Sequence, residues 1–431
     1  MLLAGLLFVF TGAVKNAGAQ EALRQSLAGE TAATAKHEAA ATIGYYNLLL
    51  GPVAWRFSSG LGVNYNDNIH LQQTNTQSDV IFSPNLETEI HWPVTENNSL
   101  DVALGIGYSA YMLHPEQDQL YINPGSGVAF DVFVGDFTID FHDRITITEN
   151  SYQNPTTGTN SSNNGNNARL ENSAGVATTW DLNQMVVNFG YEHVNYAALS
   201  SGSSQPSSAS ENGYINAGVK VRPEITVGLE AGGTLTHNQL TDTNSTSGSP
   251  DSKQWSAGVF TRAQISEYMS AQLDAGYTMF SMAGIPMLVT NSPPGTNFIR
   301  LSSGNSMAYY FNFSLTHRVN RFLNYHLTVG RSTDLQFYGQ PYDHYFAQLD
   351  PNWIILKDYQ ISTPFGWEHG QQLNGGQDST FDQFRLGINI SRQITKKLSG
   401  TVSYQWVKET DKTASLGYTV NIVGLNLSYQ F

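Results

Sequence analysis

Apolar residues recur at every second position along most of this chain, and this alternation constrains the fold more than any other feature. Over residues 53–65, apolar side chains at 53, 55, 57, 61, 63 and 65 alternate with small or polar ones. The pattern returns over 100–108, 185–191, 225–236, 269–279, 309–316, 323–330, 384–391 and 398–406. A helix needs apolar residues three or four positions apart, whereas period two indicates strands with one apolar face.

The connections between these predicted strands alternate between short and long. Short connections are predicted near 93–99, 135–136, 181–184, 223–224, 264–268, 318–322 and 394–397. Long connections are predicted at 149–168, 197–211, 238–252, 281–305 and 333–352, of which the last two are candidates to fold inward. An antiparallel sandwich also shows alternating residues, with its polar face in solvent. Short turns at one rim and long loops at the other are typical of outer-membrane barrels.

We therefore predict an all-β chain that forms a transmembrane antiparallel up-and-down β-barrel. An even strand number returns the chain to the short-turn rim, and at roughly ten residues per tilted strand we expect about eighteen strands, with sixteen as the alternative. The count depends on residues 338–367, which we interpret as a loop over 338–348, a strand over 353–357, a turn at 358–359 and a strand over 361–367. Closure is obligatory, because an open edge in lipid leaves backbone groups unsatisfied. A barrel of this size is wide enough for an aqueous lumen unless loops fill it.

Composition agrees with a protein that meets lipid on one side. Of the 431 residues, only 13% are charged and 40% are hydrophobic. Lys plus Arg total 21 against 35 Asp plus Glu, which gives a net charge of −14 and disfavours a nucleic-acid-binding surface. Without cysteine there is no disulfide framework and no thiolate metal site.

The N-terminal residues predict export. Residues 1–14 are largely apolar and are followed by Ala17-Gly18-Ala19, which indicates a signal peptide over 1–19, with a short buried helix as the alternative. We expect the Ala-rich residues 20–50 to form a periplasmic extension, helical or disordered, or alternatively a plug in the pore. Residues 51–431 are predicted to form the barrel, and the location is the bacterial outer membrane.

The tryptophans supply a second argument for a membrane. Alternation places all 7 Trp on the apolar face, and each is expected within a few residues of a strand end. Trp55, Trp92 and Trp180 are expected beside short turns, and Trp255, Trp353, Trp367 and Trp406 beside long loops. Amphipathic rings gathered at two levels are the aromatic girdles found where lipid tails meet headgroups.

The C-terminal strand resembles the terminal signal of bacterial outer-membrane proteins. Residues 423–431 alternate and end on Tyr429 and Phe431. That resemblance implies recognition by the barrel-assembly machinery. Nearer the N-terminus, residues 46–48, 51–53, 65–69 and 78–79 resemble a family of β-barrel porins, some of which are associated with exopolysaccharide loci. The family implies an outer-membrane location and a porin role, and supplies no catalytic residues.

Charged residues fall on the face opposite the apolar one, which is the lumen face of a barrel. Parity assigns to it these pore-lining candidates: Arg56, Glu87, Glu89, His91, Asp101, Asp131, Asp140, His142, Arg144, Glu171, Glu192, Lys220, Arg222, Glu230, Arg262, Asp274, His326 and Arg385. Two interpretations stay open: these charges sort solutes by sign, or they pair across neighbouring strands and stiffen the wall. Acidic residues outnumber basic ones, so we expect a weak cation preference.

Two chemical alternatives to a channel start from the same residues. Glu87-x-Glu89-x-His91 offers metal ligands, but alternate strand residues stand roughly 7 Å apart, so only two could share an ion without help from another strand. An enzyme such as an outer-membrane lipase would need a nucleophile, a base and an orienting group, and the chain has no Gly-x-Ser-x-Gly motif. We expect no catalytic residues, no metal and no cofactor.

The predicted function is a porin-like channel for passive diffusion of small hydrophilic solutes or ions. The alternative is an outer-membrane component of exopolysaccharide secretion or assembly. The expected partners are outer-membrane lipid, the barrel-assembly machinery and, in an oligomer, further copies of the chain, with no nucleic acid.

Overall fold

The computed structural model describes residues 46–148, 169–199, 207–239, 251–282, 286–288, 298–300, 305–335, 341–355, 358–372, 380–411 and 417–431. The predicted signal peptide, most of the predicted periplasmic extension and the 149–168 loop lie outside these ranges. The described part is almost entirely β-strand, with one 3₁₀ turn, η1 (Pro115–Gln117). No helix in the described ranges is long and apolar enough to cross a membrane.

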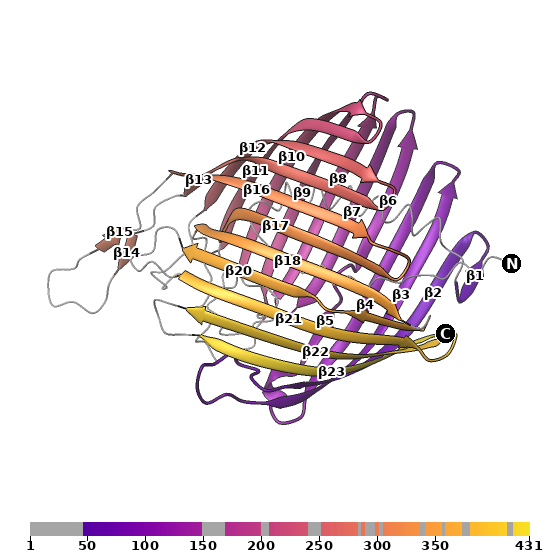
Figure 1. The fold of residues 1–431 in the computed structure, drawn as a ribbon, viewed down its shortest axis with the longest axis vertical. Helices are drawn as coiled ribbons and strands as arrows, with labels where there is room; N and C mark the ends of the chain where they lie inside the picture. Colours follow the sequence, from indigo (N-terminus) through magenta and orange to yellow (C-terminus); the bar gives the residue numbers. More distant parts are fainter. Residues whose placement is uncertain are drawn as a thin grey trace.

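The strands form one continuous antiparallel meander (Figure 1). Its members are β1 (Leu48–Leu50), β2 (Val53–Asn66), β3 (Asp79–Thr95), β4 (Asn98–Tyr111), β5 (Gln119–Ile122), β6 (Gly127–Val134), β7 (Phe137–Thr148), β8 (Arg169–Asp181), β9 (Met185–Ala198), β10 (Ser207–Arg222), β11 (Ile225–Gln239), β12 (Ser252–Ser266), β13 (Met269–Met282), β16 (Asn305–Arg318), β17 (Leu323–Leu335), β18 (Pro341–Ile355), β19 (Tyr359–Ser362), β20 (Phe365–Gln372), β21 (Thr380–Gln393), β22 (Leu398–Asp411) and β23 (Tyr418–Gln430). A separate two-stranded ladder joins β14 (Pro286–Leu288) to β15 (Phe298–Arg300). The first and last long strands, β2 and β23, pair with each other and close the ring.

The closed barrel has 18 strands, which confirms the higher of the two predicted counts. Two of the crossings are interrupted. β5 and β6 both pair with β4 and β7, and β19 and β20 both pair with β18 and β21. The breaks fall at Pro124-Gly125 and at Pro364, because proline has no N–H for the ladder and Gly125 adopts a φ of 102°.

Turn length alternates around the barrel as predicted. Consecutive strands meet at residues 96–97, 135–136, 182–184, 223–224, 267–268, 319–322 and 394–397 on one rim, where β18 also ends and β19 begins. Longer connections, including 67–78 and 112–118, lie on the other. Both β1 and the C-terminus lie at the short-turn rim, at the right of Figure 1.

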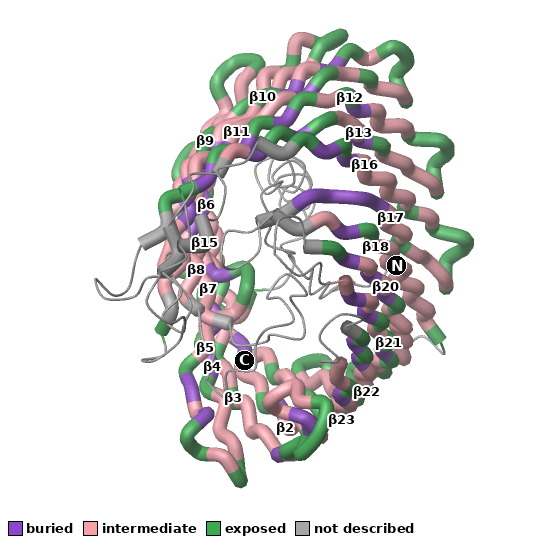
Figure 2. Tube along the Cα trace, turned by 90° about the vertical axis from the view of Figure 1, so that its left-hand side faces the viewer, coloured by how far each residue is buried: buried purple, intermediate pink, exposed green. Residues whose placement is uncertain are grey.

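The two faces of the barrel wall have the opposite burial from a soluble protein. Large apolar residues are exposed, with Leu86 at 64%, Leu229 at 67% and Met307 at 70%, whereas Asn216 is 0% and Gln383 1% exposed. Buried and exposed residues alternate along the strands in Figure 2. Exposed apolar side chains in a closed ring have no protein partner to bury them, so the outer face is built for hydrocarbon.

Two parts of the sequence prediction are wrong. Residues 341–352 belong to strand β18, whose pairing with β17 is continuous from Pro341 to Trp353, so 333–352 is not a long inward loop. As a consequence, Trp353 lies near the end of β18 at the short-turn rim and not beside a long loop. The sheet also begins at β1, a few residues before the predicted boundary at 51.

Side chains pin both ends of the β2–β23 seam. At the short-turn rim, Asn47 Oδ1 accepts the Phe57 N–H at 2.8 Å, and its Nδ2 donates to the carbonyls of Phe57 and Phe431. At the long-loop rim, the Asp67 carboxylate accepts both the backbone N–H and the side-chain Nδ2 of Asn421, each at 2.7 Å. The closing ladder is therefore tied at each end by a hydrogen-bonded side chain.

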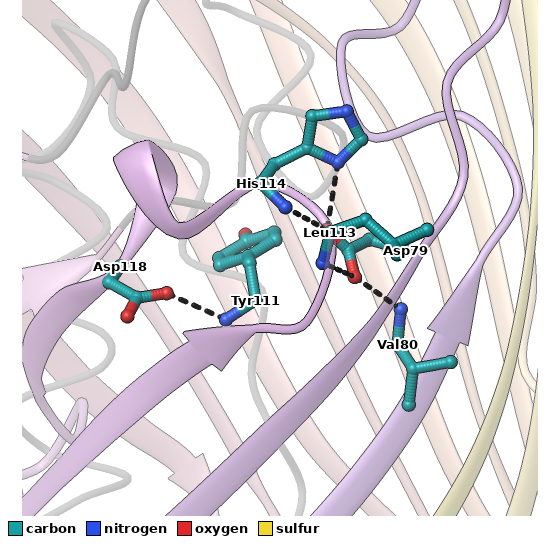
Figure 3. A network of polar contacts seen from close by, with 6 residues as sticks. All are labelled: Asp79, Val80, Tyr111, Leu113, His114 and Asp118. Atoms are coloured by element: carbon teal, nitrogen blue, oxygen red, sulfur yellow. Dashed lines mark hydrogen bonds and ion pairs between the residues drawn. The ribbon is translucent and has the colours of Figure 1, made fainter.

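A buried carboxylate organises the long-loop rim (Figure 3). Asp79, at the start of β3, accepts the backbone N–H groups of Val80 at 2.7 Å, Leu113 at 3.0 Å and His114 at 2.9 Å. Its Oδ2 also lies 2.8 Å from His114 Nδ1. These bonds fix the 112–118 connection to β3, because charge-assisted bonds to backbone N–H are stronger than neutral ones.

We expect Asp79→Ala to lower the free energy of unfolding by about 2–4 kcal/mol, because three backbone N–H groups and an imidazole lose their acceptor. Urea titration of the folded barrel measures this loss, and cleavage by protease near 112–118 should rise with it. Asp136→Ala, an exposed carboxylate in a short turn, is the matched control and should cost less than about 0.5 kcal/mol. Equal stability of the two variants would contradict the assigned role of Asp79.

Candidate functional site: the inner wall of the barrel

Contacts between strands that are not neighbours identify the inner face. The Tyr310 hydroxyl of β16 donates to Glu230 Oε1 of β11 at 2.7 Å, although β13 and β12 lie between the two strands. Strands spaced about 4.8 Å apart put these backbones roughly 14 Å from each other. Asn123 likewise donates to Glu87 Oε1 at 2.7 Å past β4. Such contacts need a concave surface, where side chains converge, so this polar face is the inside of the barrel.

Strand register places nearly all the charged candidates on this inner face. It carries Arg56, Glu87, Glu89, His91, Asp101, Asp131, Asp140, His142, Arg144, Glu171, Glu192, Lys220, Glu230, Arg262, Asp274, His326 and Arg385. Arg222 lies at the register shift before the 223–224 turn, at the rim and not along the wall. The seven tryptophans, Trp55, Trp92, Trp180, Trp255, Trp353, Trp367 and Trp406, lie on the opposite, outer face.

Further acidic residues of the inner face escaped the sequence prediction, among them Asp350, Glu368 and Glu409. Asp350 and Glu368 lie on β18 and β20, opposite His326 and Phe346 respectively. Glu409 lies on β22 opposite Gln383. Asp350 falls in the segment 333–352, which the sequence predicts as a loop, so alternation assigns it to neither face. If the alternation of residues 398–406 is continued to the end of β22, it places Glu409 on the inner face.

Many inner-face charges are paired locally. Arg56 Nη1 lies 3.3 Å from Glu89, and His91 Nδ1 lies 2.7 Å from Asp101 on the next strand. His142 Nδ1 lies 2.6 Å from Asp140. Charged residues of neighbouring strands therefore pair on the inner face, as the interpretation that these charges stiffen the wall requires.

The pairing also separates the three candidate metal ligands of β3. Glu87 accepts from Asn123, Glu89 pairs with Arg56, and His91 pairs with Asp101. Each side chain has its own partner on a different strand, so the three do not converge on one point. In the described ranges, no group of three or more His, Asp or Glu is arranged to hold a metal ion.

Glycines make the longest of these contacts possible. A Cβ at Gly258 would lie 2.2 Å from the Tyr310 hydroxyl, and one at Gly276 would lie 2.6 Å from it. The Tyr310 ring therefore lies across two glycines, on β13 and β12, to reach Glu230. Phe260 lies over Gly228 and Gly218 in the same way. Glycines give the inner wall room for aromatic rings to lie flat against the backbone.

A second network joins β17, β18, β20, β21, β22 and β23. His344 Nδ1 lies 2.8 Å from Glu368 Oε1, and the other ring nitrogen bonds Ser332. On the adjacent strands, Gln383 Nε2 donates to Glu409 at 3.0 Å and to the Tyr418 hydroxyl at 3.2 Å. All of these groups are shielded from solvent, so bonds of this kind are costly to break.

Buried apolar residues interrupt the polar inner wall near the long-loop rim. Val194, Phe280, Phe381, Val407 and Val420 are almost fully buried, and register places all five on the inner face. The inner wall is therefore mixed, with buried apolar residues among its polar ones. These buried apolar positions were not predicted from the sequence.

A charged cluster lies on the outer face near the long-loop rim. Arg331 pairs with Asp343 and packs under the rings of Tyr309 and Tyr345, 3.9 Å and 5.6 Å from the ring centres. The two tyrosine hydroxyls lie 3.1 Å apart. Pairing and aromatic cover reduce the cost of an arginine on this face, and the long-loop end of the strand is where headgroups replace hydrocarbon.

Comparison with solved structures finds matches that cover most of the chain at low sequence identity. The match to OccK2 (OpdF) of Pseudomonas aeruginosa, solved in complex with glucuronate, covers 89% of this chain and 99% of that protein. The sequence identity is 8% and the TM-score is 0.49. For Pseudomonas aeruginosa OpdQ the coverage is 88% and 98%, the identity 10% and the TM-score 0.48. The match to Acinetobacter baumannii OccAB3 covers 89% of this chain and 100% of that protein, with 9% sequence identity and a TM-score of 0.46. No protein-family description and no curated protein sequence matches the chain.

We expect Gly258→Ala to destabilise the barrel by about 1–3 kcal/mol, because the new methyl group would overlap the Tyr310 hydroxyl and the carbonyl of Ala275, 2.2 Å and 2.5 Å away. Gly213→Ala on β10 is the matched control, since a Cβ there meets nothing within 4 Å. Urea-induced unfolding in detergent compares the two. A Gly258→Ala variant as stable as the control would show that Tyr310 does not need the glycine surface.

Proposed function

We propose that this protein is a porin-like channel of the bacterial outer membrane, through which small hydrophilic solutes or ions diffuse passively. One observation carries the proposal: a closed barrel of 18 strands has ionisable groups around its inner wall and exposed apolar side chains around its outer wall. Barrels of 16–18 strands are wide enough to leave an aqueous path. Water in that path, together with local pairing, keeps the inner charges ionised.

The proposed partners follow from the two rims and the outer face. Outer-membrane lipid contacts the apolar belt, with the tryptophans of the outer face as its aromatic boundary. Because barrels of this kind place short turns in the periplasm, the short-turn rim is proposed to face that compartment. The C-terminal strand ends on Tyr429 and Phe431, whose rings are 5.5 Å apart, and is proposed to be read by the barrel-assembly machinery.

The resemblance to the porin family with exopolysaccharide-associated members leaves a second candidate, a secretion or assembly component. The channel hypothesis is preferred because the inner wall is lined by charges that water can solvate, whereas no described feature identifies a periplasmic partner. The absence of a nucleophile motif in the sequence supports a non-enzymatic role.

Single-channel recording of the purified full chain in planar lipid bilayers tests the proposal. A large, steady current in potassium chloride supports a diffusion channel. A silent barrel that binds periplasmic proteins would support the secretion component instead. Release of fatty acids from added lipid would support an enzyme and overturn the proposal.

The excess of acidic residues on the inner wall predicts a weak cation preference, measured as the reversal potential across a salt gradient. Glu89, half-exposed beside Arg56, is a suitable position to change it. We expect Glu89→Gln to lower the cation-to-anion permeability ratio by about twofold, and Arg56→Gln to raise it by a similar factor. Asp143→Asn, an exposed carboxylate on the outer face, should leave the ratio unchanged. Anion selectivity of the unaltered chain would exclude this part of the proposal.

Removal of Phe431 should reduce assembly of the barrel in cells several-fold, because the terminal aromatic residue is then missing from the proposed recognition strand. The measurement is the amount of heat-modifiable, folded barrel in outer-membrane fractions. Asn47→Ala separates recognition from local stability, since it breaks the side-chain bonds at the seam and keeps the C-terminus intact. Equal losses in both variants would favour a purely local role for Phe431.

A further inference from the structure

The short turns of the barrel divide into an acidic and a basic arc. Going around the rim from β3 to β13, the short turns or their immediate edges carry Glu96, Asp136, Asp181, Glu224 and Glu267. From β16 to β22 the rim carries a group that we name the basic arc: Arg318, Arg321, Arg392, Lys396 and Lys397. These residues lie at two short turns, between β16 and β17 and between β21 and β22. The exposed Asp358, just before β19, is the acidic residue described on the rim between these two turns.

The basic arc is exposed and has no ion pair within the described chain. All five side chains belong to solvent-exposed residues, and none has a carboxylate within 4.0 Å among the described residues. By contrast, Lys220 on the acidic arc pairs with Asp181 at 3.2 Å, and Arg56, Arg331 and Arg385 have carboxylate partners elsewhere in the barrel. The basic arc therefore offers positive charge that pairs with no carboxylate of the described residues.

Aromatic rings stack on the three arginines at the short-turn rim, where register places Arg318 at an inner-face position of β16. The guanidinium carbon of Arg318 lies 4.9 Å from the ring centre of Tyr268, that of Arg321 4.4 Å from Phe322, and that of Arg392 4.8 Å from Tyr359. Register places Arg392 and Tyr359 together on the outer face, at the short-turn end of β19 and β21. Cation–π stacking restrains an exposed arginine and leaves its N–H groups free to meet an anion.

Exposed apolar residues surround these charges. Val319, Phe322 and Ile394 lie in the turns of the basic arc, and all are exposed. Arginine and lysine beside aromatic and aliphatic residues, at the level where an apolar belt ends, match the boundary between acyl chains and phosphate groups. On the acidic arc the exposed carboxylates outnumber the basic residues Lys220 and Arg222, so that part of the rim would repel the same phosphates.

We propose that the basic arc binds the phosphate groups of anionic phospholipids in the leaflet that meets the short-turn rim. The arc gives the barrel a preferred lipid neighbour on one side only. This inference depends on the barrel spanning a membrane, and it does not depend on conduction through its lumen.

Native mass spectrometry of the full chain in detergent tests the proposal, with phosphatidylglycerol and phosphatidylcholine of identical acyl chains as the probes. We expect phosphatidylglycerol to bind about tenfold more tightly than phosphatidylcholine, since each basic residue near an anionic surface adds favourable energy. Changing Arg318, Arg321, Arg392, Lys396 and Lys397 together to Gln should bring the ratio of affinities close to one. Equal binding of the two lipids by the unaltered chain would overturn the proposal.

Two matched variants locate the effect. Changing Lys220 and Arg222 to Gln removes positive charge from the acidic arc of the same rim and should leave the lipid preference intact. Changing Arg318, Arg321 and Arg392 to Lys keeps the charge and should retain most of the preference. Equal loss in the Lys220 and Arg222 variant would show that only net charge matters, and the arc would then have no role of its own.

An internal reporter checks that the lipid sits at the arc. Trp353 lies on the outer face of β18 and pairs with Ile361 of β19, the strand that carries Tyr359. Brominated phosphatidylglycerol should quench tryptophan emission of the unaltered chain more than brominated phosphatidylcholine, and Trp353→Phe should remove most of that difference. Folding of every variant is verified by its heat-modifiable mobility on gels. If the arc binds a periplasmic protein and shows no lipid preference, the proposal is wrong.

Discussion

Closure of the backbone hydrogen-bond ladder between β2 and β23 is the constraint on which the rest of the structure depends. In hydrocarbon an unpaired strand edge leaves N–H and C=O groups without partners, at a cost of several kcal/mol for each group. Closing the ring also fixes which side chains point outward, because paired residues of neighbouring strands lie on the same face of the wall. Leu61 of β2 and Leu427 of β23 meet on the outer face, and Gly62 and Asn426 meet on the inner one. Asn47 and Asp67 tie this closing ladder at its two ends.

The closed wall explains why glycine and aromatic residues share the inner face. Side chains on a concave surface converge, so neighbouring strands cannot all carry large residues at one level. Gly258 and Gly276 have no side chains, and the Tyr310 ring occupies the space this leaves to reach Glu230. Side chains of the inner face thus pack against the backbones of neighbouring strands as well as pointing toward the lumen. An Arg, Asp or His placed in such a wall is held by its neighbours even where water is present.

The sequence predicts the architecture well because one physical rule governs it everywhere. Exposed apolar residues must face lipid, so period-two alternation reveals strands, faces and the even strand count, and it places the inner charges such as Glu230 and Asp274. The rule fails at residues 341–352, where polarity is reversed locally: Phe346 faces inward and Asp343 outward. Asp343 is tolerated there by Arg331 and Thr333, partners on another strand that no local pattern can identify. For the same reason, the local pattern does not reveal that Asp350 and Glu368 lie on the inner face or that His344 pairs with Glu368.

In the proposed channel, local pairing also decides how the inner wall acts on ions. A salt bridge such as Arg56–Glu89 or Arg385–Glu368 is a dipole, and its field falls off faster with distance than that of a single charge. Salt screens what is left beyond about 8–10 Å at ordinary ionic strength. The field at the centre of a wide lumen therefore comes mainly from the acidic residues in excess of the basic ones, and it is weak there. Strong discrimination needs solutes to approach the wall, where carboxylates such as Asp350 and Glu89 are only partly covered.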